Sequence, residues 1–342
     1  MRVKIILEKL YRKFKKEGLR SVLHTAISRV CTRLPYAKEL WHNHLKNYIK
    51  RNYGHVIRKY KNFVPSSHDS NGLNNTIWCM WWQGEENCPD IVKLCLASLR
   101  KAPPPPHNAR KLILITKDNF QQYANIPEHI LMKVNDGRIT LTHFSDIIRA
   151  QLLKQHGGLW IDSTIFAAGE IPEYIFDAEF FTIKRMAEKN PKSNSVSYSR
   201  WTGFLWGAAQ SNSLLPSFVS EIFSEYWKYN DSLFDYFFLD YVIAVAMDEF
   251  PAFREAWERL PVNNTGVFRL APLMNHEYNE GVYAELVKSN TFFKLTYKQK
   301  FDRRTVSGSE TFYCKLISLI QESYAFATPQ DKTISLHEIA TR

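Results

Sequence analysis

The sequence predicts an α/β fold with a largely parallel sheet, and three short apolar runs carry this prediction. They are residues 76–82, 111–116 and 159–161, and helical stretches separate them along the chain. Strands that alternate with helices are typical of parallel sheets with crossover helices. Ligands of such sheets bind at the carboxyl ends of the strands, so the residues after each run are the first candidates for a site.

Residues 1–64 are basic and helical in pattern. They hold 17 Lys and Arg against three Glu, a net charge of +14, whereas the rest of the chain carries −3. Two interpretations stay open: a helical extension packed on the body, or an amphipathic anchor on an anionic membrane surface. Nucleic-acid binding is not expected, because no zinc-finger, RNP or helix-turn-helix signature accompanies the charge.

Residues 65–75 (PSSHDSNGLNN) are polar and rich in turn-forming residues, so we expect a linker there and the main domain over residues 76–330. Five scattered cysteines without a CxxC pair argue against structural zinc and favour reduced thiols in the cytoplasm. No run approaches ~18 apolar residues, and residues 1–16 lack the apolar stretch of a signal peptide.

The first half of the main domain alternates strands and helices. The run at 76–82 ends in the polar turn at Gln83 and Gly84, and Pro89 then begins a helix that is expected to reach Arg100. A second strand is expected at 111–116. Short helices are expected from Asp118 and over residues 127–134.

Residues 143–164 (HFSDIIRAQLLKQHGGLWIDST) join a helix to a strand that ends on Asp162. Thr142 or His143 is expected to cap the helix, and Gly157 suits the left-handed residue that closes it.

Asp146 and Arg149 lie three positions apart on this helix, so they share a face and can pair. The plain interpretation is a buried helix–strand unit whose strand happens to end in Asp162. The functional interpretation is a group of charged side chains at the edge of the sheet.

The second half is expected to be irregular, with strands at 180–184 and 203–208, a polar loop at 187–199, and helices at 213–229 and 235–249. The last helix is strongly apolar but contains Asp240. A carboxylate there is costly unless it is paired or used. An ion pair or cap-like contact, a catalytic base and a ligand of donor hydroxyls all stay open for Asp240.

The phrases H-F-S-D-I-I-R and G-G-L-W-I-D-S-T resemble the donor-site block of GT-A glycosyltransferases with DxD motifs. They resemble in particular the capsular polysaccharide synthesis group, which is related to Och1-type mannosyltransferases and to the large clostridial glucosylating toxins. Residues 81–84 (WWQG), 237–241 (FFLDY) and 294–298 (KLTYK) are similar to further patterns of that group. The resemblance covers about residues 74–300 and implies a Rossmann-like GT-A fold that carries a basic helical N-terminal extension.

The resemblance implies a bacterial glycosyltransferase of capsular or cell-surface polysaccharide synthesis. Such an enzyme moves a sugar from a nucleotide-diphosphate donor, with UDP-sugars favoured, to a glycan or lipid-linked glycan acceptor. It would be cytoplasmic and peripheral to the inner face of the plasma membrane. Retention of the anomeric configuration is favoured, because the resembling toxins and Och1-type enzymes retain it. An inverting enzyme would need a carboxylate base near the acceptor hydroxyl, and Asp240 is the candidate for that role. The alternative is a catalytically impaired relative that binds nucleotide sugars or acts as a scaffold.

By the same resemblance, Asp162 holds Mn²⁺ or Mg²⁺ or a water bound to it, and Thr164 is the second expected metal ligand. Asp146 and Arg149 contact the donor sugar, ribose or phosphate. The remaining donor-binding residues are Trp81, Trp82, Gln83, Gly84, Gly158 and Trp160. Of these, Trp81 or Trp82 stacks on the nucleobase and Trp160 lines the pocket.

Thr164 departs from the family pattern, because members with a full DxD motif hold a second carboxylate at that position. Threonine offers a hydroxyl but no charge, so a weaker metal affinity is expected. Either a later residue completes the metal shell, with His276, Glu277 and Asp302 as candidates, or the metal arrives with the nucleotide.

Overall fold

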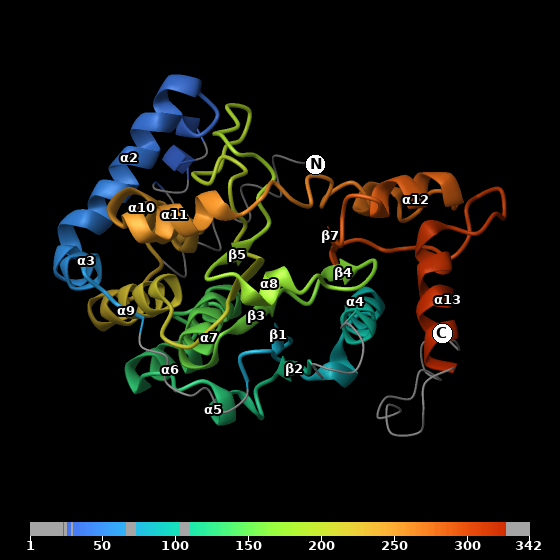
Figure 1. Ribbon diagram of the computed structural model, residues 1–342, viewed down its shortest axis with the longest axis horizontal. Coiled ribbons are helices and arrows are strands. Elements are labelled where there is room, and N and C mark those ends of the chain that lie inside the picture. Colours follow the sequence, from blue (N-terminus) through green and yellow to red (C-terminus); the bar gives the residue numbers. More distant parts are fainter. Residues whose placement is uncertain (1–22, 24–25, 29, 66–72, 103–109, 326–342) are drawn as a thin grey trace.

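The computed structural model of the chain describes residues 23, 26–28, 30–65, 73–102 and 110–325 (Figure 1). The basic helical pattern near the N-terminus, most of the expected linker and the last five residues of the expected main domain lie outside the described residues.

A five-stranded sheet in the order β2-β1-β3-β6-β5 forms the centre of the fold. Its strands are β1 (Ile77–Met80), β2 (Leu112–Ile115), β3 (Gly158–Ile161), β5 (Phe181–Thr182) and β6 (Leu205–Ala208). Strands β2, β1 and β3 are parallel, whereas β6 runs antiparallel to both β3 and β5. The predicted α/β class and all five predicted strands are confirmed. The sheet is less parallel than expected, because no crossover helix connects β5 to β6.

The register of the parallel strands fixes where the functional edge lies. Trp78 of β1 pairs with both Ile113 of β2 and Trp160 of β3. The residues that follow β1 and β3 therefore leave the sheet at the same edge. Trp81 and Asp162 are the first of these residues, and a mixed α/β sheet that gathers polar groups at this edge is consistent with a GT-A-like fold.

Helix α7 (Leu141–His156) leads into β3. Its N-cap is Thr140, whose hydroxyl accepts a hydrogen bond from the amide of His143, so the expected cap at Thr142 or His143 is wrong. Both residues lie in the first turn of the helix. Gly157 ends the helix with a φ of +73°, as predicted.

The other helices form two groups around the sheet (Figure 1). In one group α9 packs on α7, α6, α3 and α10, and in the other α4 packs on β4 and α13. Strand β4 pairs with β7 in a separate two-stranded sheet. The bounds are α2 (Pro35–Asn52), α3 (Gly54–Lys61), α4 (Asp90–Lys101), α5 (Phe120–Tyr123), α6 (Glu128–Asn135), β4 (Ile165–Ala167), α8 (Tyr174–Asp177), α9 (Leu214–Tyr229), α10 (Phe238–Glu249), α11 (Pro251–Arg259), α12 (Glu280–Val287), β7 (Phe292–Lys294) and α13 (Phe312–Ala325). Two 3₁₀ turns, η1 and η2, span Glu85–Asn87 and Ala271–Leu273.

Helices α2 and α3 are docked on the body, which agrees with the packed interpretation for this part of the basic segment. Their apolar residues, among them Leu45, Ile49 and Tyr60, belong to the buried core. Helix α2 lies against α10 and α3 lies against α9. The boundary at residue 64 stays a prediction, but these two helices share the hydrophobic core of the main domain.

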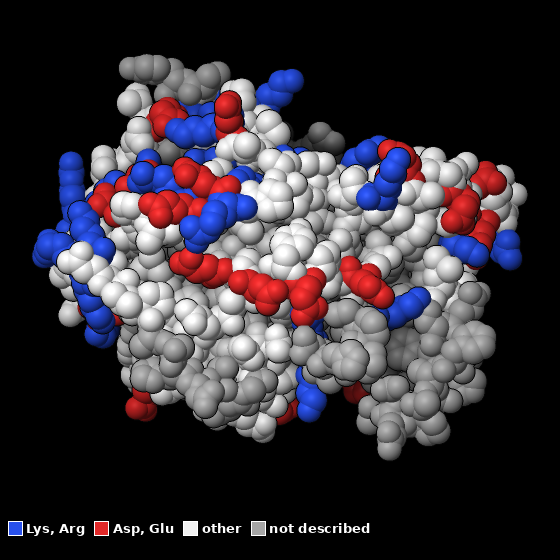
Figure 2. Space-filling view, viewed as in Figure 1, with Lys and Arg blue, Asp and Glu red and all other residues white. Residues whose placement is uncertain are grey.

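The basic side chains of α2 and α3 are largely matched by acidic ones on the neighbouring helices. Lys46 and Lys50 pair with Asp248 at 2.9 and 3.1 Å, and Lys59 pairs with Glu221 at 2.6 Å. Figure 2 shows Lys and Arg gathered over this corner of the molecule with acidic side chains interspersed. Such partly exposed pairs add little stability each, but they reduce the positive charge that these helices present to an anionic surface.

None of the helices that the structure describes is both long and apolar enough to cross a bilayer. All five cysteines are free thiols.

Candidate active site

Asp162 forms the centre of a charged cluster at the carboxyl edge of β3. Its Oδ1 accepts hydrogen bonds from Arg149 Nη2 at 2.9 Å and from the indole Nε1 of Trp160 at 3.0 Å. Its Oδ2 accepts from Lys294 Nζ at 2.8 Å. Both carboxylate oxygens are therefore bound by cationic side chains of the same chain.

These contacts keep Asp162 ionised. Burial alone would raise the pKa of this carboxyl group, but the charges of Lys294 and Arg149 outweigh that effect and hold the pKa below its ordinary value. Asp162 is therefore an anion near neutral pH, and its charge is already balanced within the protein.

Helix α7 supplies the next members of the cluster. Arg149 Nη1 donates to Asp146 Oδ1 at 2.8 Å, which confirms the predicted pairing on one helix face. The same guanidinium bridges to Asp162, so it joins the helix to the edge of the sheet. His143 Nδ1 lies 3.5 Å from Asp146 Oδ2 and packs among aromatic rings behind it. The arginine itself is only 4% exposed, so this arrangement is rigid.

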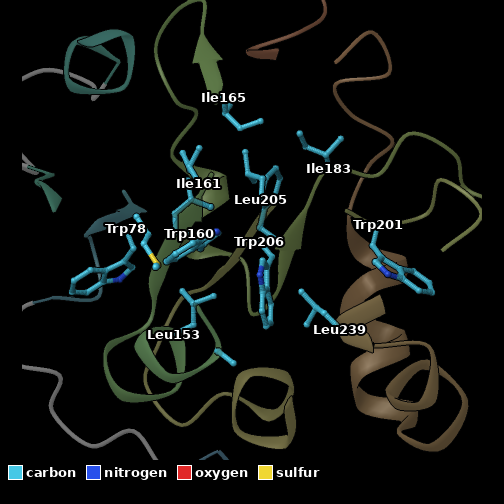
Figure 3. Close-up of a cluster of buried hydrophobic side chains, with 14 of the residues drawn as sticks. Trp78, Leu153, Trp160, Ile161, Ile165, Ile183, Trp201, Leu205, Trp206 and Leu239 are labelled. Atoms are coloured by element: carbon cyan, nitrogen blue, oxygen red, sulfur yellow. The ribbon is translucent and has the colours of Figure 1, made fainter. Parts of the chain in front are cut away.

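Trp160 is buried in the sheet next to the cluster and does not line an open pocket. It is 1% exposed, and Figure 3 shows it among the buried side chains of the sheet between Trp78 and Trp206. The guanidinium of Arg149 lies 4.9 Å from the centre of its ring. The expected pocket-wall role does not fit this burial; the indole orients Asp162 and Arg149.

Lys294 is a member of the cluster that the sequence analysis did not single out. It is the last residue of β7 and pairs in register with Ile165 of β4, only three residues after Asp162. The amide of Leu295 donates to the carbonyl of Thr164 at 2.8 Å, which continues the pairing. In the sequence, this lysine directly follows the apolar pair Phe292-Phe293 and begins residues 294–298, which resemble a family pattern.

The two tryptophans after β1 point to different surroundings. Both are partly exposed, and the ring of Trp81 meets that of Tyr297 at 5.4 Å, in the chain just beyond Lys294. Trp82 packs between Phe120 and Phe144 at 5.2 and 5.3 Å. Trp81 is therefore the better placed of the two to meet a ligand at this edge.

The rest of the expected donor-binding turn lies beside the tryptophans. Gln83 is exposed, and Gly84 adopts a φ of +85° with nothing within 4 Å of the position of a side chain. A backbone with open space in front of it can be approached closely by a ligand.

Gly158 does not join the cluster. It begins β3, at the end of the strand opposite to Asp162, and has a φ of +89°. A Cβ atom at this position would lie 2.5 Å from the carbonyl oxygen of Thr76. Close strand packing therefore explains this glycine, and the donor-binding role expected for it has no support in its position.

Asp240 faces the cluster from α10. The indole of Trp201 donates to its Oδ1 at 3.0 Å. Burial, opposed by this hydrogen bond and reinforced by the nearby charge of Asp146, raises the pKa of Asp240 to about 7. A carboxyl group with such a pKa can hold or release a proton near neutral pH. The hydrogen bond from Trp201 is therefore consistent with a functional role for Asp240 as well as with a structural one.

A hollow lies next to the cluster. Its volume is about 540 Å³, and it is lined by Phe268, Ala271, Pro272, Asn275, His276, Thr296 and Gln299. The ring of Phe268 meets that of Phe204, over which the ammonium of Lys294 lies at 4.9 Å. Partial burial of the phenol, and then the charges of Asp146 and Asp162, raise the pKa of Tyr236.

The side chains do not fit a site for Mn²⁺ or Mg²⁺ at Asp162. Both oxygens of this carboxylate bind cations, and Thr164 adds no charge. Within the described ranges, no group of three or more His, Cys, Asp and Glu side chains is arranged to hold a metal ion. Of the three further candidates, His276 lines the hollow, Glu277 is exposed and Asp302 pairs with Lys300.

The sequence as a whole matches a family model described as capsular polysaccharide synthesis protein over residues 34–316. The chain belongs to this family. The match begins at α2, so the family's shared region includes the docked basic helices as well as the sheet and the cluster. No curated protein matches the chain.

Among solved structures, the chain is similar to an apo structure of WbbM, a bifunctional glycosyltransferase. The two share 10% identity at a TM-score of 0.38, and the match covers 78% of this chain. It spans only 53% of the WbbM chain.

Proposed function

We propose that this member of the capsular polysaccharide synthesis family is a glycosyltransferase. It moves a sugar, of the hexosyl class, from a nucleotide-diphosphate donor to a glycan or lipid-linked glycan acceptor, and UDP-sugars are the favoured donors. The observation that carries the proposal is the cluster of Asp146, Arg149, Asp162 and Lys294 beside Trp81 at the carboxyl edge of parallel strands. Acidic groups for hydroxyls, cationic groups for phosphates and an aromatic face for a base are the parts that a nucleotide sugar requires.

In this proposal the donor lies along the edge from Trp81 to α7. The partly exposed face of Trp81 stacks on the nucleobase. Asp146 retains 17% of its side-chain exposure and accepts hydrogen bonds from hydroxyl groups of the sugar or ribose. Arg149 is too deeply buried to enclose a ligand, so it mainly holds the two carboxylates in place.

Asp240 is the proposed group that responds to the reacting sugar. With a pKa near 7 it either binds a donor hydroxyl or accepts a proton. We favour retention of configuration, in which the acceptor proton passes to the departing phosphate and no protein base is required. The hollow lined by Phe268 and by Thr296, which lies two residues beyond Lys294 in the chain, is proposed to receive the acceptor.

A catalytically impaired, nucleotide-binding relative is the second candidate. One observation favours it: Thr164 stands where the resembling enzymes hold a second carboxylate, and Asp162 is already paired. The two candidates differ in turnover and not in binding.

The test of the proposed function is release of nucleoside diphosphate from a panel of nucleotide sugars, with Mn²⁺ present and with glycan acceptors. The full chain is expected to turn over at least one donor, and Asp146→Asn is expected to lower kcat/KM by about 10- to 100-fold, the loss of one charge-assisted contact. Binding of nucleotide without turnover on any acceptor would favour the impaired relative. Full activity of Asp146→Asn would refute the role of this cluster.

We also propose that the N-terminal basic segment associates with anionic membrane, from the inner face in a bacterium. Removing residues 1–33 leaves α2 and its core contacts in place, so it is the suitable truncation. The full chain is expected to sediment with vesicles that contain phosphatidylglycerol and the truncated chain is not. Equal sedimentation of both would refute the anchor.

A further inference from the structure

Lys294 brings an ammonium group to Asp162, the residue that the resemblance predicts as a metal ligand. Its Nζ lies 2.8 Å from Asp162 Oδ2, and the side chain keeps 23% of its exposure. The contacts that the structure describes for this nitrogen are that hydrogen bond and the ring of Phe204. An ammonium has three donors, so further donors remain for an anion from solvent.

The position of this lysine is built into the backbone. Phe292 and Phe293 are fully buried, and the amide of Lys294 donates to the carbonyl of Val267 at 2.7 Å. The pairing of β7 with β4 then sets the lysine beside the turn that carries Asp162. Asp162, in turn, is fixed by Trp160 and Arg149, so the ammonium is held between a rigid strand and a rigid carboxylate.

The charges of the cluster show which ligand it lacks. Arg149 and Lys294 match Asp146 and Asp162 one for one, so a divalent cation added at Asp162 would meet two positive side chains and a carboxylate whose two oxygens both accept hydrogen bonds from them. An anion with several oxygens, such as a diphosphate, instead meets a partly exposed ammonium backed by a guanidinium.

We infer that Lys294 binds the diphosphate of the donor and takes the role of the metal ion, so that transfer requires no divalent cation. The inference rests on the proposed function. In the transfer step the bond from the anomeric carbon to the β-phosphate oxygen breaks, and its electron pair stays on that oxygen. The acceptor oxygen bonds to the anomeric carbon and its proton passes to the phosphate. Lys294 stabilises the charge that develops on the diphosphate, and Asp162 is the positioning residue that holds Lys294.

The experiment compares the full chain and its variants in EDTA and in Mn²⁺. Turnover is measured as nucleoside diphosphate release, and affinity is measured by calorimetry with UDP, GDP, ADP and dTDP as probes. In EDTA the wild-type chain is expected to keep at least half of its turnover in Mn²⁺. Lys294→Ala is expected to weaken diphosphate binding in EDTA by at least tenfold, and Lys294→Arg to recover most of that loss.

Two controls separate this role from a structural one. Lys288→Ala removes the same charge from an exposed position on the C-terminal end of α12 and is expected to leave affinity unchanged. Asp162→Asn is expected to lower kcat/KM by the same factor in EDTA and in Mn²⁺, whereas a metal ligand would lose activity that higher Mn²⁺ restores.

The inference is overturned if EDTA abolishes turnover and Mn²⁺ restores it. It is also overturned if Lys294→Ala, still folded by its melting curve, binds the diphosphate as the wild type does, or if the wild type binds none of the probes in EDTA. If no donor is turned over in either condition, the proposed function alone is refuted. The binding measurement is independent of turnover, since tenfold weaker diphosphate binding by Lys294→Ala would still show that the lysine contacts the diphosphate.

Discussion

Replacing Arg149 by methionine should destabilise the fold more than any other single change in the charged cluster. The guanidinium pairs with Asp146 at 2.8 Å and with Asp162 at 2.9 Å, and it packs on the ring of Trp160. Methionine has a similar length and fills much of the space, but it leaves both carboxylates without this cation. Only Asp162 keeps a second cationic partner, Lys294.

The magnitude follows from the burial of the pairs. Removing one partner of a buried ion pair costs about 3–5 kcal/mol. Asp146 and Asp162 keep 17% and 28% of their side-chain exposure, so water compensates part of the loss. We therefore expect the lower end, about 3 kcal/mol. With an unfolding entropy of about 2.1 cal/mol/K per residue, a chain of 342 residues loses about 1.4 °C per kcal/mol, so the melting temperature should fall by about 4 °C.

The assay is a thermal melt of Arg149→Met beside Arg51→Met, which makes the same substitution at an exposed position of α2. The control should stay within about 1 °C of the wild type. Equal melting temperatures for the two variants would refute the view that Arg149 holds the helix and the sheet edge together.

Three further predictions follow from the same structure. The pKa of Asp240 is about 7 in the fold and near 4 in the unfolded chain, so the folded state holds an extra proton between these values and loses stability as the pH rises from 4 to 7. The loss is at most about 4 kcal/mol. The free energy of unfolding of Asp240→Asn, measured by urea denaturation, should not show this loss between pH 4 and 7. An identical pH profile for both proteins would contradict the raised pKa of Asp240. Trp81→Ala should weaken nucleoside diphosphate binding about 5- to 150-fold in calorimetry through lost stacking, whereas Trp82→Ala should mainly lower the melting temperature; the reverse pattern would show that Trp82 meets the base. Gly158→Ala should lower the free energy of unfolding in urea by about 3 kcal/mol, because Gly158 has a positive φ and a Cβ atom would clash with the carbonyl of Thr76. Gly169 has open space around it, so Gly169→Ala should be nearly neutral. Similar costs for the two variants would refute the packing role of Gly158.

Local features of the fold and site were predictable because local spacing determines them. The pairing of Asp146 with Arg149 needs only one helical turn, and the strand ending on Asp162 needs only its apolar run. The helix cap shows the limit even at short range. Thr140 and Thr142 are equally good capping residues, and the sequence does not say at which of them the chain enters the helix.

The orientation of side chains was less predictable. Trp81 and Trp82 both follow β1 and are both partly exposed, so neither composition nor strand alternation says which of them meets a ligand. Trp160 reads as a site residue because it precedes Asp162, yet β3 is buried on both faces and encloses it.

Lys294 could not be predicted, because it reaches Asp162 across 132 residues of sequence. Its place depends on β7 pairing with β4, and each of these strands has only three residues. Such short strands give little periodic signal. The residue that changes the chemistry most is therefore the one that only the tertiary structure supplies.

The most direct test of the proposed function is turnover of a panel of nucleotide sugars by the full chain, measured as the release of nucleoside diphosphate. We expect turnover of at least one donor by the wild type and a loss of about 10- to 100-fold for Asp146→Asn, with Lys288→Ala unchanged. Turnover that is indifferent to Asp146→Asn, or no turnover of any donor by the wild type, would contradict it.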